Sequence, residues 1–390
     1  MHFDVVVVGA GMIGLAVVRG LLDVQDSLCI AVIDVDKSLP GAELRVSAIN
    51  HSTVECFKRW GVWTDLHFPD RAGVRQMEIW EAHSSGKLCF HASDLGQEAL
   101  NVIVKNISMI QALKTQLKSS PQVHFFMPVE WTNLERISDS HWEVELSDGR
   151  QLSATWLIGA DGAASRVREC LKIETAVQDY AQEAMVANIH LEHPHQSTAY
   201  QRFLSGGPLA ILPLNGAHEA SIVWTLSKAE SDHHWNLNDA DFNQALTAAL
   251  DHRLGALSVT SARLRFPLKT QHAKSYVASG ACLIGDAAHS IHPLAGQGVN
   301  LGFHDVKVLC EILECAKQEG RPVLTLSHFK KYERQAWMHN EMIRQGMSLI
   351  NSLFLGEKKS EICVKARGFG MNFVDHFGIV KNWFSQVAQG

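Results

Sequence analysis

The sequence lacks the spacings that hold metal ions or disulfide bonds. Its eight cysteines are scattered, with no Cys-x-x-Cys pair, and its 21 histidines include no His-Glu-x-x-His motif. Metal sites need paired thiols or closely spaced histidines, and disulfide frameworks are built on regular cysteine patterns. We therefore expect no metal site, and we expect reduced cysteines in a cytoplasmic protein.

Long apolar runs and an excess of positive charge are also missing. Glycines interrupt the apolar run Val5–Val18, and nothing approaches the roughly 20 unbroken apolar residues of a membrane-spanning helix. No basic segment precedes this run, so we expect no secretory signal. The net charge of −6 argues against nucleic acid as a partner. These absences predict a soluble protein.

One segment is suited to a surface. Residues Val364–Val387 are apolar, aromatic and basic. This composition is typical of a helix that lies on a membrane, here the inner membrane face, or on a partner subunit such as a second copy. A helix that covers the core is the alternative that we prefer. We therefore predict a C-terminal helical segment over 346–390.

The chain up to Asp34 has the pattern of a βαβ unit. The apolar run Phe3–Val8 predicts a buried parallel strand, and Gly9-Ala10-Gly11-Met12-Ile13-Gly14 follows it directly. A helix is predicted for Leu15–Val24 and a second strand for Leu28–Ile33. Such glycines let backbone N–H groups approach a pyrophosphate, and Asp34, at the end of the second strand, can bind ribose hydroxyls. The unit predicts a dinucleotide, and its fingerprint serves FAD and NAD alike.

A second ligand-binding pattern spans Gly285–Gly302. The strand Ala281–Ile284 places the Asp286 carboxylate at a strand end, where open α/β sheets bind ligands. Gly296 and Gly298 lead into a predicted helix, whose bare N–H groups and positive dipole end would stabilise a ring that becomes electron-rich. A flavin meets this description. The structural alternative is a strand–turn–helix in which Asp286 caps the helix.

Two more stretches carry residues suited to a nucleotide. Arg45 precedes a helix predicted for Ser47–Arg59, and its guanidinium either pairs with phosphate oxygens or is simply solvated. The strand Leu152–Ile158 leads into a glycine-containing loop with Asp161 just past the strand end. We expect Asp161 to bind the nucleotide or to fix its loop against the βαβ unit. A purely structural turn is the alternative.

Between about Ala184 and Pro267 the pattern changes to alternating strands. One helix is expected there, at Ala240–Leu250, together with five strands: Met185–Leu191, Thr198–Leu204, Leu209–Leu214, Ala220–Leu226 and Ala262–Pro267. An antiparallel sheet laid over a nucleotide domain creates a cleft at the boundary, where ligands usually bind. The region shows no Ser-His-Asp or paired-carboxylate pattern, so we predict no catalytic acid or base there.

Three separated motifs stand in a fixed order along the chain. They are GAGMIG at Gly9, GADGAASRVR at Gly159 and GDAAHSIHPLAGQGVNLG at Gly285. Together they resemble the FAD-dependent aromatic hydroxylases of the para-hydroxybenzoate hydroxylase type. The stretches RVSAIN, GVW and HSIHPLAGQGVNLGFHD are similar to the ubiquinone-biosynthesis hydroxylases among them, and DHRLG, SARLRFPL and SIVWTLS resemble the bacterial 2-polyprenylphenol hydroxylases. The resemblance covers nearly the whole chain.

The resemblance implies an α/β fold with a Rossmann-like FAD-binding domain, an antiparallel-sheet substrate domain and C-terminal helices. The FAD-binding domain is discontinuous and comprises 1–75, 101–183 and 268–345; the substrate domain comprises 76–100 and 184–267. The histidines His289 and His292, with Pro293, lie close to the flavin by motif and shape the site, and no catalytic residue is assigned. The implied FAD contacts are Gly9, Gly11, Met12, Gly14, Asp34, Arg45, Asp161, Gly285, Asp286, Pro293, Gly296, Gly298, Val299 and Asn300.

The implied reaction is the hydroxylation of a polyprenylated phenol by O2 in ubiquinone biosynthesis, through a flavin C4a-hydroperoxide. NAD(P)H is the implied transient reductant, and the first ring hydroxylation is the preferred step. The alternatives are another ring position, a prenyl reductase of the same fold, and a prenyl-lipid carrier that does not use flavin. The intact loops around Asp161 and Asp286 argue against a carrier.

Overall fold

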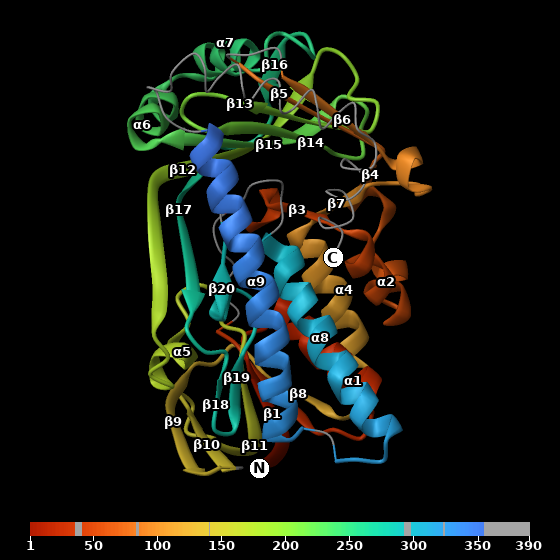
Figure 1. Ribbon diagram of the computed structural model, residues 1–390, viewed down its shortest axis with the longest axis vertical. Helices are drawn as coiled ribbons and strands as arrows, with labels where there is room; N and C mark the ends of the chain where they lie inside the picture. The colour runs from red at the N-terminus through yellow and green to blue at the C-terminus, as the bar shows by residue number, and fades with distance from the viewer. Residues whose placement is uncertain (36–40, 83–85, 140, 292–297, 323, 355–390) are drawn as a thin grey trace.

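The computed structural model describes residues 1–390 except 36–40, 83–85, 140, 292–297, 323 and 355–390. Figure 1 shows one sheet near the N terminus, a second sheet at the opposite end of the long axis, and helices packed beside them. The fold is the expected α/β arrangement with an antiparallel second sheet. Most of the C-terminal segment predicted at 346–390 lies outside the described residues.

The first sheet has a parallel centre in the order β19-β11-β1-β2-β8. Its central strand β1 (His2–Val8) is apolar because both of its faces are covered, and Val5, Val6 and Val7 are fully buried. The other parallel strands are β2 (Ile30–Ile33), β8 (Val123–Phe126), β11 (Gln151–Gly159) and β19 (Ala281–Leu283). Antiparallel strands extend the sheet: β9 (Trp131–Ser138), β10 (His141–Leu146) and β18 (Val277–Ala278).

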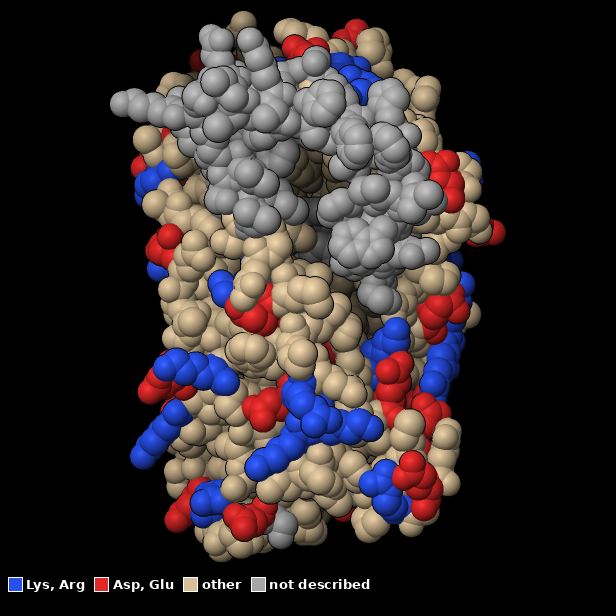
Figure 2. Space-filling view, in the orientation of Figure 1, with Lys and Arg blue, Asp and Glu red and all other residues tan. Residues whose placement is uncertain are grey.

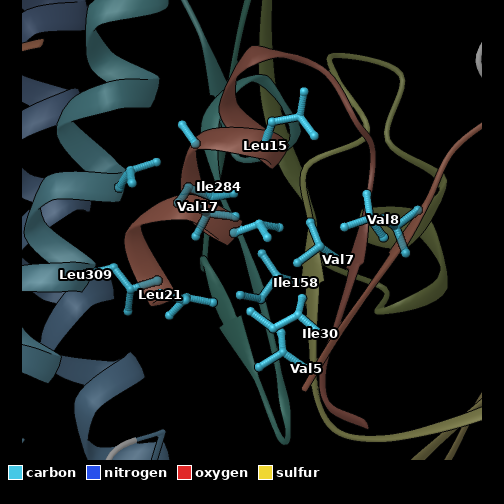
Figure 3. Close-up of a cluster of buried hydrophobic side chains, with 14 of the residues drawn as sticks. Val5, Val7, Val8, Leu15, Val17, Leu21, Ile30, Ile158, Ile284 and Leu309 are labelled. Carbon is cyan, nitrogen blue, oxygen red and sulfur yellow. The ribbon is translucent and has the colours of Figure 1, made fainter. Parts of the chain in front are cut away.

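Four helices pack against one another beside this sheet. Helix α1 (Met12–Val24) contacts α4 (Asn106–Lys118) and α8 (Gly298–Gln318), and α8 contacts α9 (Leu326–Phe354). Figure 3 shows apolar side chains from strands and helices meeting in one cluster, among them Val5, Val7, Leu15, Val17, Leu21, Ile30, Ile158, Ile284 and Leu309. Each such side chain contributes roughly 1.5–3 kcal/mol on burial. This core holds the ends of β1, β11 and β19 at one edge of the sheet.

The second sheet has the order β20-β17-β12-β15-β14-β13-β5-β6, and only the β13–β5 pair is parallel. Its strands, with β16 paired to β12, are β5 (Gln76–Glu81), β6 (Lys87–His91), β12 (Thr175–Leu191), β13 (Thr198–Phe203), β14 (Pro208–Pro213), β15 (Glu219–Ser227), β16 (Leu257–Val259), β17 (Leu264–Ala273) and β20 (His289–Ser290). Helices α6 (Lys228–Asn236) and α7 (Asp239–Ala249) cover its outer face (Figure 1). The inner face therefore looks toward the first sheet.

A small third sheet replaces part of one predicted helix. The helix expected at Ser47–Arg59 begins only at His51, because β3 (Val46–Ile49) pairs with β7 (Asn101–Lys105), which also pairs with β4 (Arg71–Val74). Helix α2 (His51–Arg59) starts where the Asn50 side chain accepts a hydrogen bond from the Thr53 N–H. Pairing with residues 53 to 59 positions further along the chain decided this segment, and no local pattern shows it.

Several elements were not expected from the sequence, and two of them are instructive. Strand β9 has one buried side chain, Leu134, so it carries little apolar alternation. Helix α6 is polar, but its start is a capping box between Ser227 and Glu230, a local signal that could have revealed it. The short remaining elements are α3 (Val62–Asp65), α5 (Arg166–Cys170), and the 3-10 turns η1 (Ala42–Leu44), η2 (Phe68–Asp70), η3 (Ala92–Leu95) and η4 (Gly285–Ala287).

The division into an FAD-binding and a substrate domain stays a prediction. Strand β12 begins at Thr175 and β17 ends at Ala273, so both strands run past the predicted boundaries of 184–267. Among the described helices, none is long and apolar enough to cross a membrane. On the face drawn in Figure 2, basic and acidic side chains lie interspersed over the lower half.

Candidate active site

A cavity of about 810 Å³ lies between the edge of the first sheet and the inner face of the second. Its walls include loop residues that follow β1, β11 and β19: Ala10, Gly11, Met12, Ile13, Ala160, Gly162 and Asp286. The sequence places these loops about 150 and 125 residues apart. Parallel pairing of β1 with β11, and of β11 with β19, brings them together because the carboxyl ends of parallel strands share one edge.

The glycines of the first loop serve two different purposes. Gly9 has φ +107°, and a Cβ there would lie 2.3 Å from the Ala160 carbonyl oxygen; a Cβ on Gly14 would lie 1.9 Å from the Gly9 carbonyl oxygen. These two positions must be glycine for packing. Gly11 lines the cavity, and a Cβ there would meet no described atom within 4 Å. The empty space beside Gly11 is where a ligand can approach the start of α1.

Asp34 and Arg45 both line the cavity, as the sequence predicted for nucleotide-binding residues. The Ala10 N–H donates a 2.5 Å hydrogen bond to Asp34 Oδ2, so the acid sits against the glycine loop. The Arg45 guanidinium lies 5.5 Å from the centre of the Phe266 ring, on the second sheet. Arg45 is thus both exposed and on the cavity wall, so either sequence interpretation is compatible with its position, and its contact with phosphate oxygens stays a prediction.

Asp161 is engaged with its own loop. Its carboxylate accepts hydrogen bonds from Ser165 Oγ (2.5 Å) and from the Val167 N–H (3.1 Å), so it stabilises the start of α5. Its neighbour Gly162 lines the cavity with φ +83°. These contacts are those of the structural turn that was the alternative, while fixation of the loop against the βαβ unit by Asp161 and direct contact with a nucleotide both stay predictions.

Sequence reasoning missed Arg168. Its buried guanidinium donates to the Ala287 carbonyl oxygen (2.8 Å) and to the Ala163 carbonyl oxygen (3.0 Å). It thereby joins the loop after β11 to the loop after β19. No local pattern indicates this role, because an arginine on a short helix is usually exposed.

The third loop supplies a carboxylate and a helix start. Asp286 is exposed to the cavity, and Gly298 and Val299, at the start of α8, also line it. A Cβ on Gly298 would meet no described atom within 4 Å. Gly285, with φ +61°, lies against Ile13 of α1, so its role in the structure is packing. The predicted site residues His292, Pro293 and Gly296 lie outside the described residues.

Asn300 has its side chain directed away from the cavity lining. Its Nδ2 donates to the Ala48 carbonyl oxygen (2.8 Å), and its Oδ1 accepts from the Asn50 N–H (3.0 Å). It fixes the start of α8 against the end of β3. His289 is likewise not on the cavity wall: it is buried, with Nε2 2.5 Å from Asp305 Oδ2. Any contact of these two residues with a cofactor stays a prediction.

The second sheet contributes an almost apolar wall. Alternate residues of its strands face the cavity, including Met77, Ala184, Val186, Ala199, Ala210, Leu212, Val223 and Phe266. Polar residues interrupt this wall, among them the buried Gln201 and the fully buried Ser221, with Tyr200 of β13 and Ser290 of β20 also in the lining. Ser221 Oγ and the Oδ1 of Asn188, its cross-strand neighbour, have no hydrogen-bond partner among the described residues. The sequence predicted an antiparallel sheet with a cleft beside it, but not which of its residues line the cavity.

A model of the FAD binding domain family matches residues 2–340. The chain belongs to this family. It is 34% identical to the 3-demethoxyubiquinol 3-hydroxylase of Escherichia coli, over 99% of this chain and 98% of that protein. It is 31% identical to the ubiquinone biosynthesis monooxygenase COQ6 of Drosophila melanogaster, over 100% of this chain and 90% of that protein. The protein is accordingly an FAD-dependent monooxygenase.

Solved structures show the same fold. The p-nitrophenol 4-monooxygenase PnpA of Pseudomonas putida superposes with a TM-score of 0.80 at 15% identity, covering 100% of this chain and 99% of that one. A probable FAD-dependent monooxygenase of Pseudomonas aeruginosa, pqsL, gives 0.78 at 19% identity, covering 91% and 97%. The similarity extends over both sheets and the helices between them.

The described residues fit FAD. Gly11 and Gly298 leave open space at two helix starts, where backbone N–H groups and the helix dipole favour negative charge. Asp34 follows β2 and Asp286 follows β19, so their carboxylates line the cavity from opposite ends of the sheet edge that carries the loops. Both carboxylates can accept hydrogen bonds from hydroxyl groups of the cofactor. The cavity volume is within the range of cofactor and ligand sites. Bound and reduced, FAD would supply the oxygen-activating chemistry that the protein side chains lack.

Proposed function

We propose that this monooxygenase hydroxylates the aromatic ring of a polyprenylated phenol in ubiquinone biosynthesis. The observation that carries the proposal is the cavity's asymmetry: loops suited to FAD form one wall, and an apolar sheet face with Gln201 and Ser221 forms the other. An apolar wall suits a ring that carries an isoprenoid tail. The relatives named as ubiquinone-biosynthesis enzymes support this substrate class.

Each wall of the cavity has its own task in this proposal. On the loop wall, Gly11 and Asp34 would bind the adenosine diphosphate part, and Asp286 with the start of α8 would hold the flavin part. On the sheet wall, apolar side chains would exclude water, and the unpaired Ser221 hydroxyl would orient a polar ring substituent. NAD(P)H is the proposed transient reductant. No residue is assigned as the base for the phenol.

Our preferred step is the first ring hydroxylation, that of a 2-polyprenylphenol. Hydroxylation of 3-demethoxyubiquinol is the second candidate, because the Escherichia coli relative that is named for this reaction matches 99% of the chain. The two substrates differ in the substituents that a polar group on the sheet wall would meet. We therefore propose that contacts with Ser221 and Gln201 determine which ring position is hydroxylated.

The test is oxygen incorporation by the purified flavoprotein. Reduced enzyme is mixed with 18O2 and either a 2-polyprenylphenol or 3-demethoxyubiquinol, and the products are analysed by mass spectrometry. We expect one labelled hydroxyl on the preferred ring and faster flavin oxidation in the presence of that substrate. Flavin oxidation without a labelled product from either ring would reject the proposal. Saturation of the tail without oxygen incorporation would instead indicate a prenyl reductase.

A further inference from the structure

A buried acid–histidine pair lies directly behind the cavity loop that contains Asp286. His289 Nε2 is 2.5 Å from Asp305 Oδ2, and both side chains are almost completely buried. Asp305 also accepts hydrogen bonds from the Gly285 N–H (3.0 Å) and from Asn340 Nδ2 (2.9 Å). Burial raises the pKa of Asp305, but the charge and hydrogen bond of His289 and the other donors outweigh it, so the pKa is lowered. The carboxylate is therefore ionised at neutral pH.

Several elements present titratable groups to His289, and they differ in charge. Asp305 and His304 lie near it on α8, and Asp286 lies near it in η4. Tyr276, whose ring centre is 5.7 Å away, His272 of β17 and His339 of α9 are its other titratable neighbours. Asn340 of α9 does not titrate and donates its hydrogen bond to Asp305. Burial is the main cause of the lowered pKa values of His272, His304 and His339. Those three rings are therefore uncharged near neutral pH.

His289 behaves in the opposite way. Burial lowers its pKa, but Asp305, through charge and hydrogen bond, and Asp286, through charge, overcome this and raise the pKa. The 2.5 Å contact with Asp305 Oδ2 and the direction of the pKa both favour the protonated imidazole, with one carboxylate buried in α8 and the other on the cavity wall.

The protonation of the Asp286 carboxyl depends on the charge of His289. Its side chain is exposed to the cavity, yet protein encloses it closely enough that desolvation raises the pKa of its carboxyl. The charges of His289 and Arg45 act against this rise, and the charge of Asp305 adds to it. Without His289, Asp286 would more readily take up a proton. A carboxylate accepts stronger hydrogen bonds than a neutral carboxyl group does.

We propose that His289, held as a cation by Asp305, keeps Asp286 ionised toward FAD and is thereby a positioning residue for cofactor binding. The inference rests on the proposed contact between Asp286 and a hydroxyl group of FAD. It gives a function to a buried histidine that does not reach the cavity wall. It also explains why an acid in the second turn of α8 is buried beside the loop that follows β19.

The first test is FAD affinity as a function of pH. FAD is removed from the purified holoprotein, and the dissociation constant is measured by flavin fluorescence from about pH 5 to about pH 9 for wild type, His289→Gln, Asp305→Asn and the double variant. In His289→Gln the loss of affinity should begin at a higher pH than in wild type, with roughly tenfold weaker binding near pH 6. An unshifted profile in folded His289→Gln protein would overturn the inference.

The direction of the shift in Asp305→Asn separates two explanations. If Asp305 acts only by its own charge, its removal eases the ionisation of Asp286 and moves the loss of affinity to lower pH. If it acts by holding the proton on His289, the loss moves to higher pH, which is the expected result. Nitrogen-15 NMR of the His289 ring provides a second readout: both ring nitrogens should be protonated at neutral pH in wild type, and only one in Asp305→Asn. A neutral His289 in wild type contradicts the proposal.

Controls distinguish misfolding and a wrong cofactor contact. His289→Gln leaves Asp305 as a buried charge without its counter-ion, so thermal unfolding is recorded for each variant. The double variant keeps a neutral hydrogen-bonded pair, and its loss of FAD affinity should also move to higher pH, but by less than in His289→Gln, because the Asp305 charge is removed as well. Asp286→Asn should bind FAD weakly at every pH. Wild-type affinity in Asp286→Asn would overturn the Asp286 contact and the inference with it, whereas weak binding there with an unshifted His289→Gln profile would overturn the inference alone.

Discussion

The two walls of the cavity are built in different ways. The loop wall depends on the backbone: on strand ends that share one edge of the sheet, on glycines and on the starts of α1 and α8. A Cβ would clash at some of these glycines and would meet no described atom at others. The sheet wall depends on side chains, which are mostly small and apolar, with Gln201 and Ser221 as exceptions. The first kind of wall suits a cofactor common to a large family. The second kind determines which substrate the enzyme accepts.

The sharpest test of the loop wall compares two of its glycines. Gly14→Ala would put a Cβ 1.9 Å from the Gly9 carbonyl oxygen, and we expect a loss of about 3 kcal/mol in the free energy of unfolding. Gly11→Ala meets no described atom within 4 Å, so it should fold normally and lose roughly tenfold or more in FAD affinity. Chemical denaturation of the apoprotein and FAD titration measure the two effects. Equal behaviour of both variants would contradict the assignment of separate roles.

The helices behind the loop wall make its stability depend on pH. The His304 ring of α8 stacks on the His339 ring of α9 at 3.9 Å, and burial, helped by His339, lowers the pKa of His304 from 6.5 to about 4. The unfolded chain therefore binds this proton more readily than the folded one. Stability is full above pH 6.5 and declines as the pH falls toward 4, by up to about 3 kcal/mol.

Variants at two histidines check the sign of this dependence. In urea denaturation, His304→Asn should flatten the decline in the free energy of unfolding between about pH 6.5 and about pH 4. These limits are the pKa values of His304 in the unfolded and in the folded chain. His289, whose pKa is raised, stabilises the fold most below the unfolded pKa of 6.5, and its contribution is lost as the pH rises through the folded value. His289→Gln should therefore change the alkaline side of the same curve. A wild-type acid slope in His304→Asn would show that other groups dominate.

The sheet wall should affect the substrate without affecting FAD. Ser221→Ala removes a buried hydroxyl of the cavity lining that has no hydrogen-bond partner among the described residues, and we expect kcat/KM to fall roughly tenfold, or about 1.4 kcal/mol, with FAD affinity unchanged. Ser258→Ala, in β16 of the same sheet but not on the cavity wall, is the matched control and should behave as wild type. A fall in FAD affinity in Ser221→Ala would mean that the two walls are not independent.

The smallest effect is expected at the exposed edge of the second sheet. Lys269 Nζ lies 3.1 Å from Asp179 Oδ2 between β17 and β12, and both side chains are 55% exposed. Solvent screens such a pair, so Lys269→Ala should leave the thermal unfolding midpoint and kcat/KM unchanged within error. A clear loss in either would show that the long strands β12 and β17 need their exposed ends to hold the cavity.

Local patterns allowed much of the fold to be predicted. The β-branched run of β1, the glycine loop and the acid Asp34 predicted the first βαβ unit, and alternation predicted β12, β13, β14, β15 and β17 of the second sheet, but not β6, β16 or β20. The helix predicted at Ser47–Arg59 was partly wrong, because pairing with β7 overrode the local pattern in Val46–Ile49. Strand β9 and helix α6 were missed because neither has a long apolar face.

The candidate site was only partly accessible to the same reasoning. Gly11, Asp34, Arg45, Asp286, Gly298 and Val299 were expected to lie at the site, and all six line the cavity. Arg168 and Asp305 were not expected, because a buried charge becomes visible only when its partners are placed around it, and those partners lie far away in the sequence.

By itself, the amino-acid sequence determined where the strands of the first βαβ unit end and where glycines follow them, since these depend on neighbouring residues. The lack of room for a Cβ on Gly9 already depends on the Ala160 carbonyl oxygen of a distant loop. Tertiary structure alone decided which of those ends face a common cavity, which polar atoms on the sheet wall have no partner, and which histidine is charged. Those properties arise from contacts between segments distant in the chain, and the same residue type takes a different charge and role in each surrounding.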